Sequence, residues 1–339
     1  TCHRLMNYSE SQLILDEIKK AKRILLNCHR HPDSDSIGST LAMRQVLLKL
    51  GKEIEIICPS EDIPQSINYL VGFDEITTNV NFRKFDFSKS DLFLTLDSSS
   101  WDMVSGLKDF KPPEMKIIVV DHHLTNTLYG DINLVDTKVT SVGEMLFSIF
   151  EDWAITIEKD IADCLMAGII GDTGAFRYPG SNSRTLYIGG KLIELGANKD
   201  KAVDAIYRSD SFELLKFYGD VLSRFQIDRE YKFVWSAIPH EIYKKLKQPS
   251  LAKESAASMF TQVVEGTDFG FVAVEQELGK LSISFRSRTG FNTSEIASEL
   301  GGGGHIYASG AKVELPFNEA VEKVLEVCRK YAQKTHSAI

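Results

Sequence analysis

The stretch Lys116-Ile-Ile-Val-Val-Asp121-His122-His123 decides the fold of this chain. Its apolar residues run without alternation and end in one carboxylate and two imidazoles. Such a run is typical of a central strand in a parallel sheet, because both faces of that strand are covered by other parts of the protein. Ligand sites in these sheets lie just beyond the carboxyl ends of the strands. The stretch therefore predicts a buried strand that delivers metal ligands.

Three further segments repeat this pattern, in which an apolar run is followed by His or Asp. They are residues 24–28 with the polar segment 29–35, residues 91–96 with Asp97, and residues 161–170 with Asp172. If one sheet orders these segments, their polar residues meet at one edge. We therefore expect a single site built from four separate parts of the chain.

Composition limits the class of protein. At 339 residues the chain has room for about two domains. A net charge of −8 argues against broad electrostatic binding to long nucleic acid, which needs a basic face. The five cysteines include no Cys-x-x-Cys pair and are too scattered for a disulfide framework.

The sequence contains no membrane or secretion signal that we recognise. No apolar run approaches the roughly 20 residues that span a bilayer, and the first residues, Thr1-Cys-His-Arg-Leu-Met, lack the apolar core of a secretion signal. We expect a cytoplasmic protein without a membrane partner, although a leader missing before Thr1 would not show.

The order of the patterns predicts two domains. Strand and helix patterns alternate as far as residue 123, which implies right-handed crossovers and a doubly wound, mainly parallel α/β sheet. Helical patterns follow, and we expect a catalytic domain over 1–195, a helical linker over 196–230 and a smaller domain over 231–339. Alternating runs at 270–276 and 280–286 predict a hairpin, so the smaller domain should be α/β with a mixed sheet.

Six residues are candidate metal ligands, and none is a cysteine. They are His29, Asp33, Asp35, Asp97, His122 and Asp172. Carboxylates with imidazoles suit Mn²⁺, Fe²⁺ or Co²⁺, whereas structural zinc normally recruits thiolates. Because Asp33 and Asp35 are two apart on an extended loop, they serve two neighbouring ions more easily than one. Two ions roughly 3.5–4 Å apart are usual for in-line phosphoryl displacement.

Each candidate also has a purely structural interpretation. Asp97 alone would more often be a turn or helix-cap residue, His29 a hydrogen-bonded core histidine, and His122 with His123 a surface pair. The repeated coincidence of these residues with the ends of apolar runs favours a metal site.

Four ordered motifs resemble those of the DHH phosphoesterase family. They are His-x-x-x-Asp-x-Asp-x-x-Gly-Ser at 29–39, Leu-Asp-Ser-Ser at 96–99, Val-Asp-His-His at 120–123 and Gly-Asp-Thr-Gly at 171–174. Phe-Arg-Ser-Arg at 285–288 and Gly-Gly-Gly-Gly-His at 301–305 resemble the DHH-associated C-terminal domain. The sequence departs from many members at His31, where Asn is frequent, and at Ser34, where Gly is frequent. Size and domain plan are most similar to the nanoRNase branch.

The resemblance implies two Mn²⁺ ions, with Co²⁺ or Mg²⁺ as substitutes. The ligands of the first ion would be His29, Asp33 and Asp97. The ligands of the second would be Asp35, Asp97, His122 and Asp172. Asp121 would orient its neighbours, and His123 would face the scissile phosphate. A hydroxide shared by both ions would be the nucleophile.

The smaller domain holds the candidate substrate residues. The glycine run is either a flexible loop or a surface where backbone N–H groups approach a phosphate, with Gly303, Gly304 and His305 in contact with it. Arg286 and Arg288, two apart at a strand end, are either a solvated edge or a clamp for a terminal phosphate. Arg177 follows Asp172 closely enough to reach the same substrate.

The resemblance implies hydrolysis of short single-stranded RNA or DNA oligonucleotides, and of 3′-phosphoadenosine-5′-phosphate (pAp). Inorganic pyrophosphatase, exopolyphosphatase, dinucleotide phosphodiesterase and a noncatalytic nucleotide- or RNA-binding module stay open as alternatives. A pyrophosphatase would bring a pocket richer in Lys and Arg, and the cyclic-dinucleotide enzymes usually carry membrane segments. The oligomeric state, with a homodimer among the alternatives, also stays open.

Overall fold

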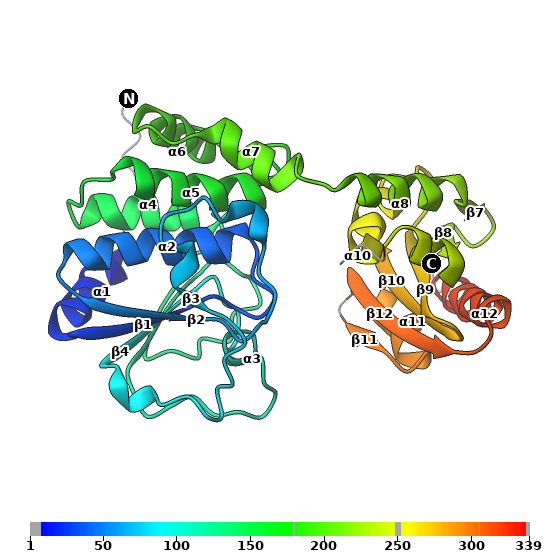
Figure 1. The fold of residues 1–339 in the computed structure, drawn as a ribbon, viewed down its shortest axis with the longest axis horizontal. Helices are drawn as coiled ribbons and strands as arrows, with labels where there is room; N and C mark the ends of the chain where they lie inside the picture. Colours follow the sequence, from blue (N-terminus) through cyan, green and yellow to red (C-terminus); the bar gives the residue numbers. More distant parts are fainter. Residues whose placement is uncertain (1–7, 179, 248–251, 305, 337–339) are drawn as a thin grey trace. The chain divides into compact units, whose positions relative to one another are not determined.

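Six parallel strands form the sheet of the first structural unit, in the spatial order β3-β2-β1-β4-β5-β6 (Figure 1). The strands are β1 (Arg23–Asn27), β2 (Glu53–Ile57), β3 (Ile76–Thr77), β4 (Leu92–Leu96), β5 (Ile117–Asp121) and β6 (Ile132–Val135). The order changes direction at β1 and β4, so the sheet is doubly wound. The predicted fold class is confirmed for this unit.

The coordinates are a computed structural model that describes residues 8–178, 180–247, 252–304 and 306–336. These residues divide into two compact units, with the boundary between Ser209 and Asp210. In the described part of the chain, no helix is both long and apolar enough to cross a bilayer.

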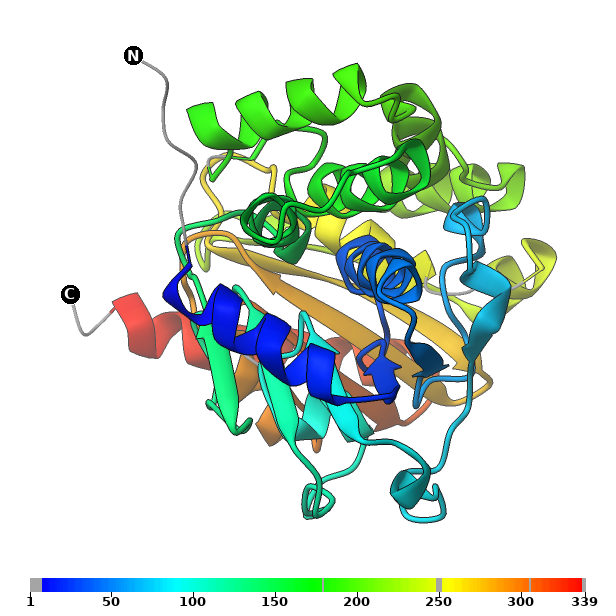
Figure 2. The same ribbon diagram turned by 90° about the vertical axis from the view of Figure 1, so that its left-hand side faces the viewer.

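The described part of the first unit contains seven α-helices. They are α1 (Ser9–Lys20), α2 (Ser34–Lys49), α3 (Trp101–Ser105), α4 (Val142–Asp152), α5 (Lys159–Asp172), α6 (Ser183–Glu194) and α7 (Lys199–Tyr207). Short 3₁₀ turns occur at Gln65–Ile67, Phe73–Glu75 and Phe87–Lys89. In Figure 2, where this unit faces the viewer, α4 and α5 lie on the same side of the strands as α2. Helices α6 and α7 pack outside α4 and α5.

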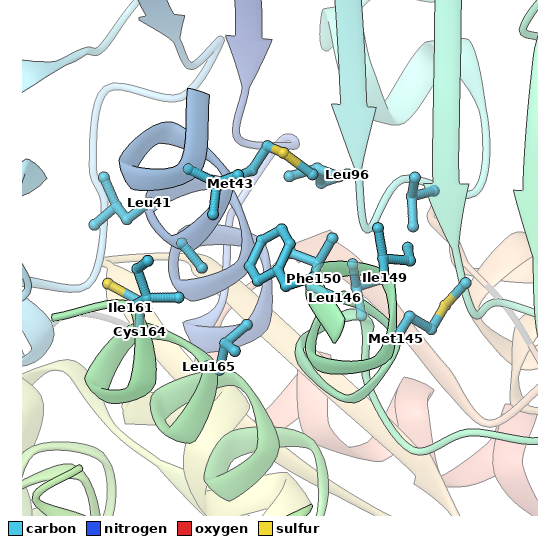
Figure 3. Close-up of a cluster of buried hydrophobic side chains, with 14 of the residues drawn as sticks. Leu41, Met43, Leu96, Met145, Leu146, Ile149, Phe150, Ile161, Cys164 and Leu165 are labelled. Atoms are coloured by element: carbon cyan, nitrogen blue, oxygen red, sulfur yellow. The ribbon is translucent and has the colours of Figure 1, made fainter. Parts of the chain in front are cut away.

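Both faces of the sheet are covered, as the unbroken apolar strands predict. On β4, Leu94 belongs to the core beneath the helices, whereas its neighbour Phe93 faces an aromatic cluster with Phe82 and Trp101. Figure 3 shows the core on the helical side, where apolar side chains of α2, α4 and α5 gather, among them Met43, Phe150 and Leu165. The close contact of α2 with α5 sets the positions of the polar residues at their ends.

A six-stranded mixed sheet forms the second unit, in the order β11-β12-β10-β9-β8-β7. Its strands are β7 (Gln226–Asp228), β8 (Phe233–Ile238), β9 (Phe269–Glu277), β10 (Lys280–Ser287), β11 (Gly303–Gly304) and β12 (Ala308–Glu314). Among the described strands of this second sheet, β8 and β9 are the only neighbours that run parallel, and the other pairs are antiparallel. Its helices are α8 (Phe212–Ser223), α9 (His240–Lys245), α10 (Ala252–Ala256), the π-helical turn Ala257–Thr261, α11 (Thr293–Glu299) and α12 (Phe317–His336).

The apolar run at 161–170 belongs to helix α5, in agreement with the helical pattern expected there, so Asp172 lies at the end of a helix. The segment 196–230, expected as a helical linker, is divided between the two units. Helix α7 packs on α5, Phe217 of α8 lies in a core of the second unit, and residues 226–228 form strand β7. An amphipathic helix shows in the sequence which face is apolar, but not which domain covers that face.

Candidate metal centre

Polar residues from five elements converge at the carboxyl edge of the first sheet. His29 follows β1, Asp97 follows β4, and His122 follows β5. The first turn of α2 and the last turn of α5 add Asp35 and Asp172. The described residues form three groups of possible metal ligands. In each group, one ligand atom from every residue lies within 4.8 Å of the others. The groups are His29–Asp33–Asp97, Asp35–His122–Asp172 and Asp97–His122–His123. All six predicted ligands are therefore brought together.

Asp97 lies at the centre of this arrangement. Its Oδ2 is 3.6 Å from His29 Nε2, and its Oδ1 is 3.4 Å from His122 Nε2. Its φ of 54° is in the left-handed region, which Asp adopts more readily than most residues but at a cost. Its buried Oδ1 accepts no hydrogen bond from the described residues. One carboxylate thus connects two ligand groups and has an oxygen available for a cation.

Two helix N-termini fix the other carboxylates. Asp33 caps α2, and its Oδ1 accepts hydrogen bonds from the N–H groups of Asp35 and Ser36, both at 3.0 Å. The buried Asp35 accepts from the first two residues of α4, Val142 N at 2.6 Å and Gly143 N at 3.0 Å. The positive end of the α4 dipole therefore stabilises Asp35 as a carboxylate. The sequence marks a helix start at Ser141, but not that a distant carboxylate occupies it.

Glycines allow the helices to bring these groups close together. A Cβ at Gly168 of α5 would overlap Asp35 Oδ1, and a Cβ at Gly171 would overlap Ser34 Oγ. At Gly143 a Cβ would lie 3.3 Å from Asp35 Oδ1. At Gly143 and Gly168 the space that a side chain would fill is occupied by the candidate ligand Asp35, and at Gly171 it is occupied by the neighbouring Ser34, so these glycines belong to the site.

The electrostatics favour a positive charge at this edge. Burial raises the pKa of Asp35 to about 8, and the nearby Asp97 adds to the shift; the hydrogen bond from Gly143 N at the start of α4 acts against it but does not outweigh it. Burial, with Asp35 and Asp97 nearby, also raises the pKa of Asp172 well above its usual value. For Asp97 burial acts in the same direction, but the imidazoles of His122 and His29 outweigh it and hold its pKa below the usual range. Burial lowers the pKa of each of these histidines, but Asp97 outweighs it and raises both values to about 9.

Asp121 and His123 form a separate hydrogen-bonded pair. His123 Nδ1 lies 2.8 Å from Asp121 Oδ1, and Asn126 Nδ2 donates to Asp121 Oδ2 at 2.6 Å. Asp121 is fully buried, whereas the His123 side chain is 42% exposed. His123 Nδ1 is also 3.6 Å from Asp97 Oδ1, so the imidazole borders the metal ligands.

The residues present fit divalent cations. The edge combines four carboxylates with two imidazoles, places them within ligand range, and leaves a buried oxygen of Asp97 without a hydrogen bond from the described residues. The four described cysteines, Cys28, Cys58, Cys164 and Cys328, are all buried, and none belongs to the three groups. Such a ligand set suits Mn²⁺ or a similar ion better than structural zinc.

The predicted substrate residues of the second unit are less closely associated. Arg286 Nε donates to Ser258 Oγ at 2.9 Å, whereas Arg288 Nη1 donates to the carbonyl of Thr267 at 3.2 Å. The strand β10 ends at Ser287, so Arg288 lies outside it. The two arginines therefore do not form the side-by-side pair that the sequence predicts.

The glycine run is ordered by strand pairing, in contrast to the flexible-loop alternative. Gly303 and Gly304 form β11, which pairs with Gly310 and Ser309 of β12. Gly304 has a φ of 140°, which favours glycine, and a Cβ there would lie 2.6 Å from Ser309 Cα. His305 lies outside the described residues.

Arg177 of the first unit lies near the metal ligands but is already engaged. Its Nε donates to the carbonyl of Gly174 at 2.6 Å, and its guanidinium lies 5.3 Å from the ring centroid of Tyr207. Tyr207 in turn donates to the carbonyl of Gly171 at 2.9 Å. The side chains of Arg177 and Tyr207 therefore support the turn around Asp172.

Two family models match the chain, in the order that the motifs suggest. The model of the DHH family N-terminal domain matches residues 23–169, and the model of the DHHA1 domain matches residues 247–334. Together they cover more than half of the chain. The chain is a DHH-family phosphoesterase. Five of the six candidate ligands lie in the matched DHH segment, and Asp172 lies just beyond it.

Relatives and solved structures agree with this assignment. The chain is 28% identical to the "Bifunctional oligoribonuclease and PAP phosphatase NrnA" of Thermus thermophilus, over 95% of each chain. An "exopolyphosphatase-related protein" from Bacteroides fragilis has the same fold, with a TM-score of 0.86 and 24% identity over 97% of this chain and 98% of that one. The exonuclease RecJ bound to manganese matches with a TM-score of 0.50 and 15% identity, over 97% and 96% of the two chains.

Proposed function

We propose that this DHH-family protein hydrolyses short oligoribonucleotides to mononucleotides and removes the 3′-phosphate from pAp, with two Mn²⁺ ions at the carboxyl edge of the first sheet. The observation that carries the proposal is Asp97, a buried carboxylate faced by His29 on one side and His122 on the other. The names of relatives such as the Thermus thermophilus protein support the substrates.

Each group of ligands has a defined role in this proposal. His29, Asp33 and Asp97 hold the first ion, while Asp35, Asp97, His122 and Asp172 hold the second. When bound, the cations lower the pKa of a water molecule and stabilise the charge of the phosphoryl group. The glycines at 143, 168 and 171 keep the carboxylates at their positions.

His123 is the proposed catalytic residue beside the ions. Asp121 accepts a hydrogen bond from Nδ1, which fixes the tautomer and leaves Nε2 toward the substrate. The hydrogen bond to Asp121 and the charge of nearby Asp97 raise the pKa of His123, although burial acts against them. A protonated imidazole at this position stabilises the scissile phosphate or donates a proton to the leaving oxygen.

The second unit is the proposed holder of the remote part of the substrate. Arg286 and Arg288 supply guanidinium groups for a phosphate, and the backbone of Gly303 and Gly304 permits its close approach. His305 and Arg177 complete the proposed substrate contacts. A hydrogen bond from Arg286 to Ser258 holds the guanidinium in place before substrate binds.

A panel of substrates tests the proposal. Purified protein, freed of metal and supplied with Mn²⁺, is incubated with di- to pentanucleotides, pAp, pyrophosphate and polyphosphate, and products are separated by chromatography. We expect mononucleotides from the oligonucleotides and AMP from pAp. Turnover of pyrophosphate or polyphosphate alone would contradict the proposal, and binding of nucleotides without turnover would favour a noncatalytic module.

A further inference from the structure

A hollow of about 440 Å³ lies at the same carboxyl edge as the metal ligands but contains none of them. Its walls are the segments that follow three neighbouring strands, with Arg30 and His31 after β1, residues 59–62 after β2 and residues 79–82 after β3. The end of α3 closes it at Gly106 and Leu107. Its volume is within the range of roughly 300–1,000 Å³ that is usual for small-molecule sites.

Hydrogen bonds between the segments hold the hollow open. His31 N donates to Ser60 Oγ at 2.7 Å, Asn79 N donates to Ser60 O at 2.8 Å, and Arg30 N donates to Met103 O at 2.7 Å. His31 and Asn79 have φ values of 55° and 58°, in the left-handed region. Strained backbone of this kind persists where the surrounding structure fixes it, and it is frequent at ligand sites.

The hollow is adjacent to the metal centre along the chain. Arg30 and His31 directly follow the ligand His29, and two Cα–Cα steps span at most about 7.6 Å. The backbone that lines the hollow at Arg30 and His31 therefore lies within about one nucleotide unit of the backbone that carries His29.

The chemistry of the walls suits a nucleobase better than a phosphate. Val80 and Leu107 provide apolar surface, and Asn79 offers an amide that both donates and accepts hydrogen bonds. The exposed Arg30 guanidinium has no hydrogen-bond or ion-pair partner within the described residues, so its plane is available for stacking. Glu61 also lines the hollow, and its carboxylate disfavours a second anion.

We infer that this hollow is a nucleoside subsite, which takes the base of the nucleotide next to the scissile phosphate, with Arg30 stacked on the base and Asn79 hydrogen-bonded to its edge. The inference rests on the proposed function and specifies the substrate class. A chain of phosphates without bases gains nothing from these walls, so the subsite separates oligonucleotides from polyphosphate.

Abasic analogues test the subsite. Wild-type protein and Arg30→Ala are compared on diadenylate (pApA) and on two analogues that lack the base at the first or the second position. One of the two bases occupies the hollow. For the wild type, the analogue that lacks this base should have a kcat/KM lower by about tenfold or more, as expected for the loss of a stacked base. Arg30→Ala should lower kcat/KM on pApA to that level and leave the corresponding abasic analogue unchanged.

Two further variants sharpen the test. Asn79→Gly removes the amide but suits the left-handed backbone, and it should raise KM for pApA several-fold with little effect on kcat. Arg83→Ala, in the same segment but outside the hollow, is the matched control and should behave as wild type. Equal wild-type turnover of all three substrates would overturn the inference. The inference would also be overturned if Arg30→Ala lost kcat/KM equally on pApA, on the abasic analogues and on bis-p-nitrophenyl phosphate.

Binding of adenosine separates this inference from the proposed function. Calorimetry without added metal compares adenosine with ribose. If the wild type hydrolyses no nucleotide but binds adenosine, and Arg30→Ala weakens this binding about tenfold, the proposed function fails and the subsite stands. If the wild type hydrolyses dinucleotides without any base dependence, the function stands and the subsite is refuted. Absence of both hydrolysis and adenosine binding would refute both.

Discussion

The carboxyl edge of the first sheet and the polar face of the second sheet use charge in opposite ways. At the first, Asp35, Asp97 and Asp121 are buried, and helix N-termini or histidines fix them. At the second, Arg286 is partly exposed and donates to the hydroxyl of Ser258 and the carbonyl of Phe285, and Arg288 is exposed. A buried charge cluster requires a counter-charge, whereas an exposed cation is stable without one. The first region is therefore suited to permanent metal binding, and the second to transient contact with substrate.

Removal of metal should produce the largest effect and tests the first half of this comparison. Chelation should abolish hydrolysis, and Mn²⁺ should restore it better than Mg²⁺, because Mg²⁺ accepts imidazole ligands such as His29 and His122 poorly. Initial rates after re-addition of each ion measure this, and far-UV circular dichroism checks that the fold survives chelation. Full activity with Mg²⁺ alone would count against the imidazole ligands.

Asp97→Asn should have the next largest effect. The variant keeps the size of the side chain but removes the charge that lets two cations lie close together, so kcat should fall by about three orders of magnitude or more. Metal content should fall below two ions per chain by elemental analysis. Asp102→Asn, an exposed aspartate on α3, is the control and should change neither quantity. Unchanged turnover in Asp97→Asn would refute the shared-ligand role.

Gly168→Ala tests whether close packing of α5 positions Asp35. The added methyl group would overlap Asp35 Oδ1, so it should destabilise the protein by about 1–3 kcal/mol and lower kcat about tenfold. Gly190→Ala in α6 is the matched control, because nothing lies within 4 Å of its added Cβ. That variant should gain about 0.5–1 kcal/mol with unchanged kcat. Thermal melts measure the stability of each variant, and steady-state kinetics measure its kcat. Equal behaviour of the two variants would refute the idea that the packing of α5 positions Asp35.

The same contrast explains which parts of the site the sequence could predict. His29, Asp97 and His122 follow apolar runs, and the topology of parallel strands alone brings such positions to one edge. The hydrogen bonds from Val142 N and Gly143 N to Asp35 were not predicted. Asp35 lies more than one hundred positions from these two residues, and only the packing of the helices brings them together. Periodicity identifies helices but not which helix N-terminus meets which carboxylate.

The second unit shows the opposite limit. The hairpin of β9 and β10 was predicted from its alternating residues, and the structure confirms it. Arg286 and Arg288 are two positions apart, a spacing that would place both on one face of a strand. The strand ends between them, at Ser287. Where a strand ends depends more on its pairing with neighbouring strands than on the local sequence. The glycine run pairs with Gly310 and Ser309 of β12, which follow it closely in the chain, but the run itself carries no alternating pattern that would predict a strand.

Arg286→Ala should have the smallest effect and tests the second half of the comparison. If Arg286 holds a phosphate remote from the scissile bond, the variant should keep its metal and lose about 1.5–3 kcal/mol of transition-state stabilisation on dinucleotides, or roughly tenfold or more in kcat/KM. His305→Ala should behave in the same way. Bis-p-nitrophenyl phosphate offers no remote group, so its hydrolysis should stay almost unchanged. Lys280→Ala, at the other end of β10 and paired with Glu277, is the control for loss of a cation. Equal losses on both substrates would mean that Arg286 supports the catalytic centre or the fold, because only a substrate contact can discriminate between them.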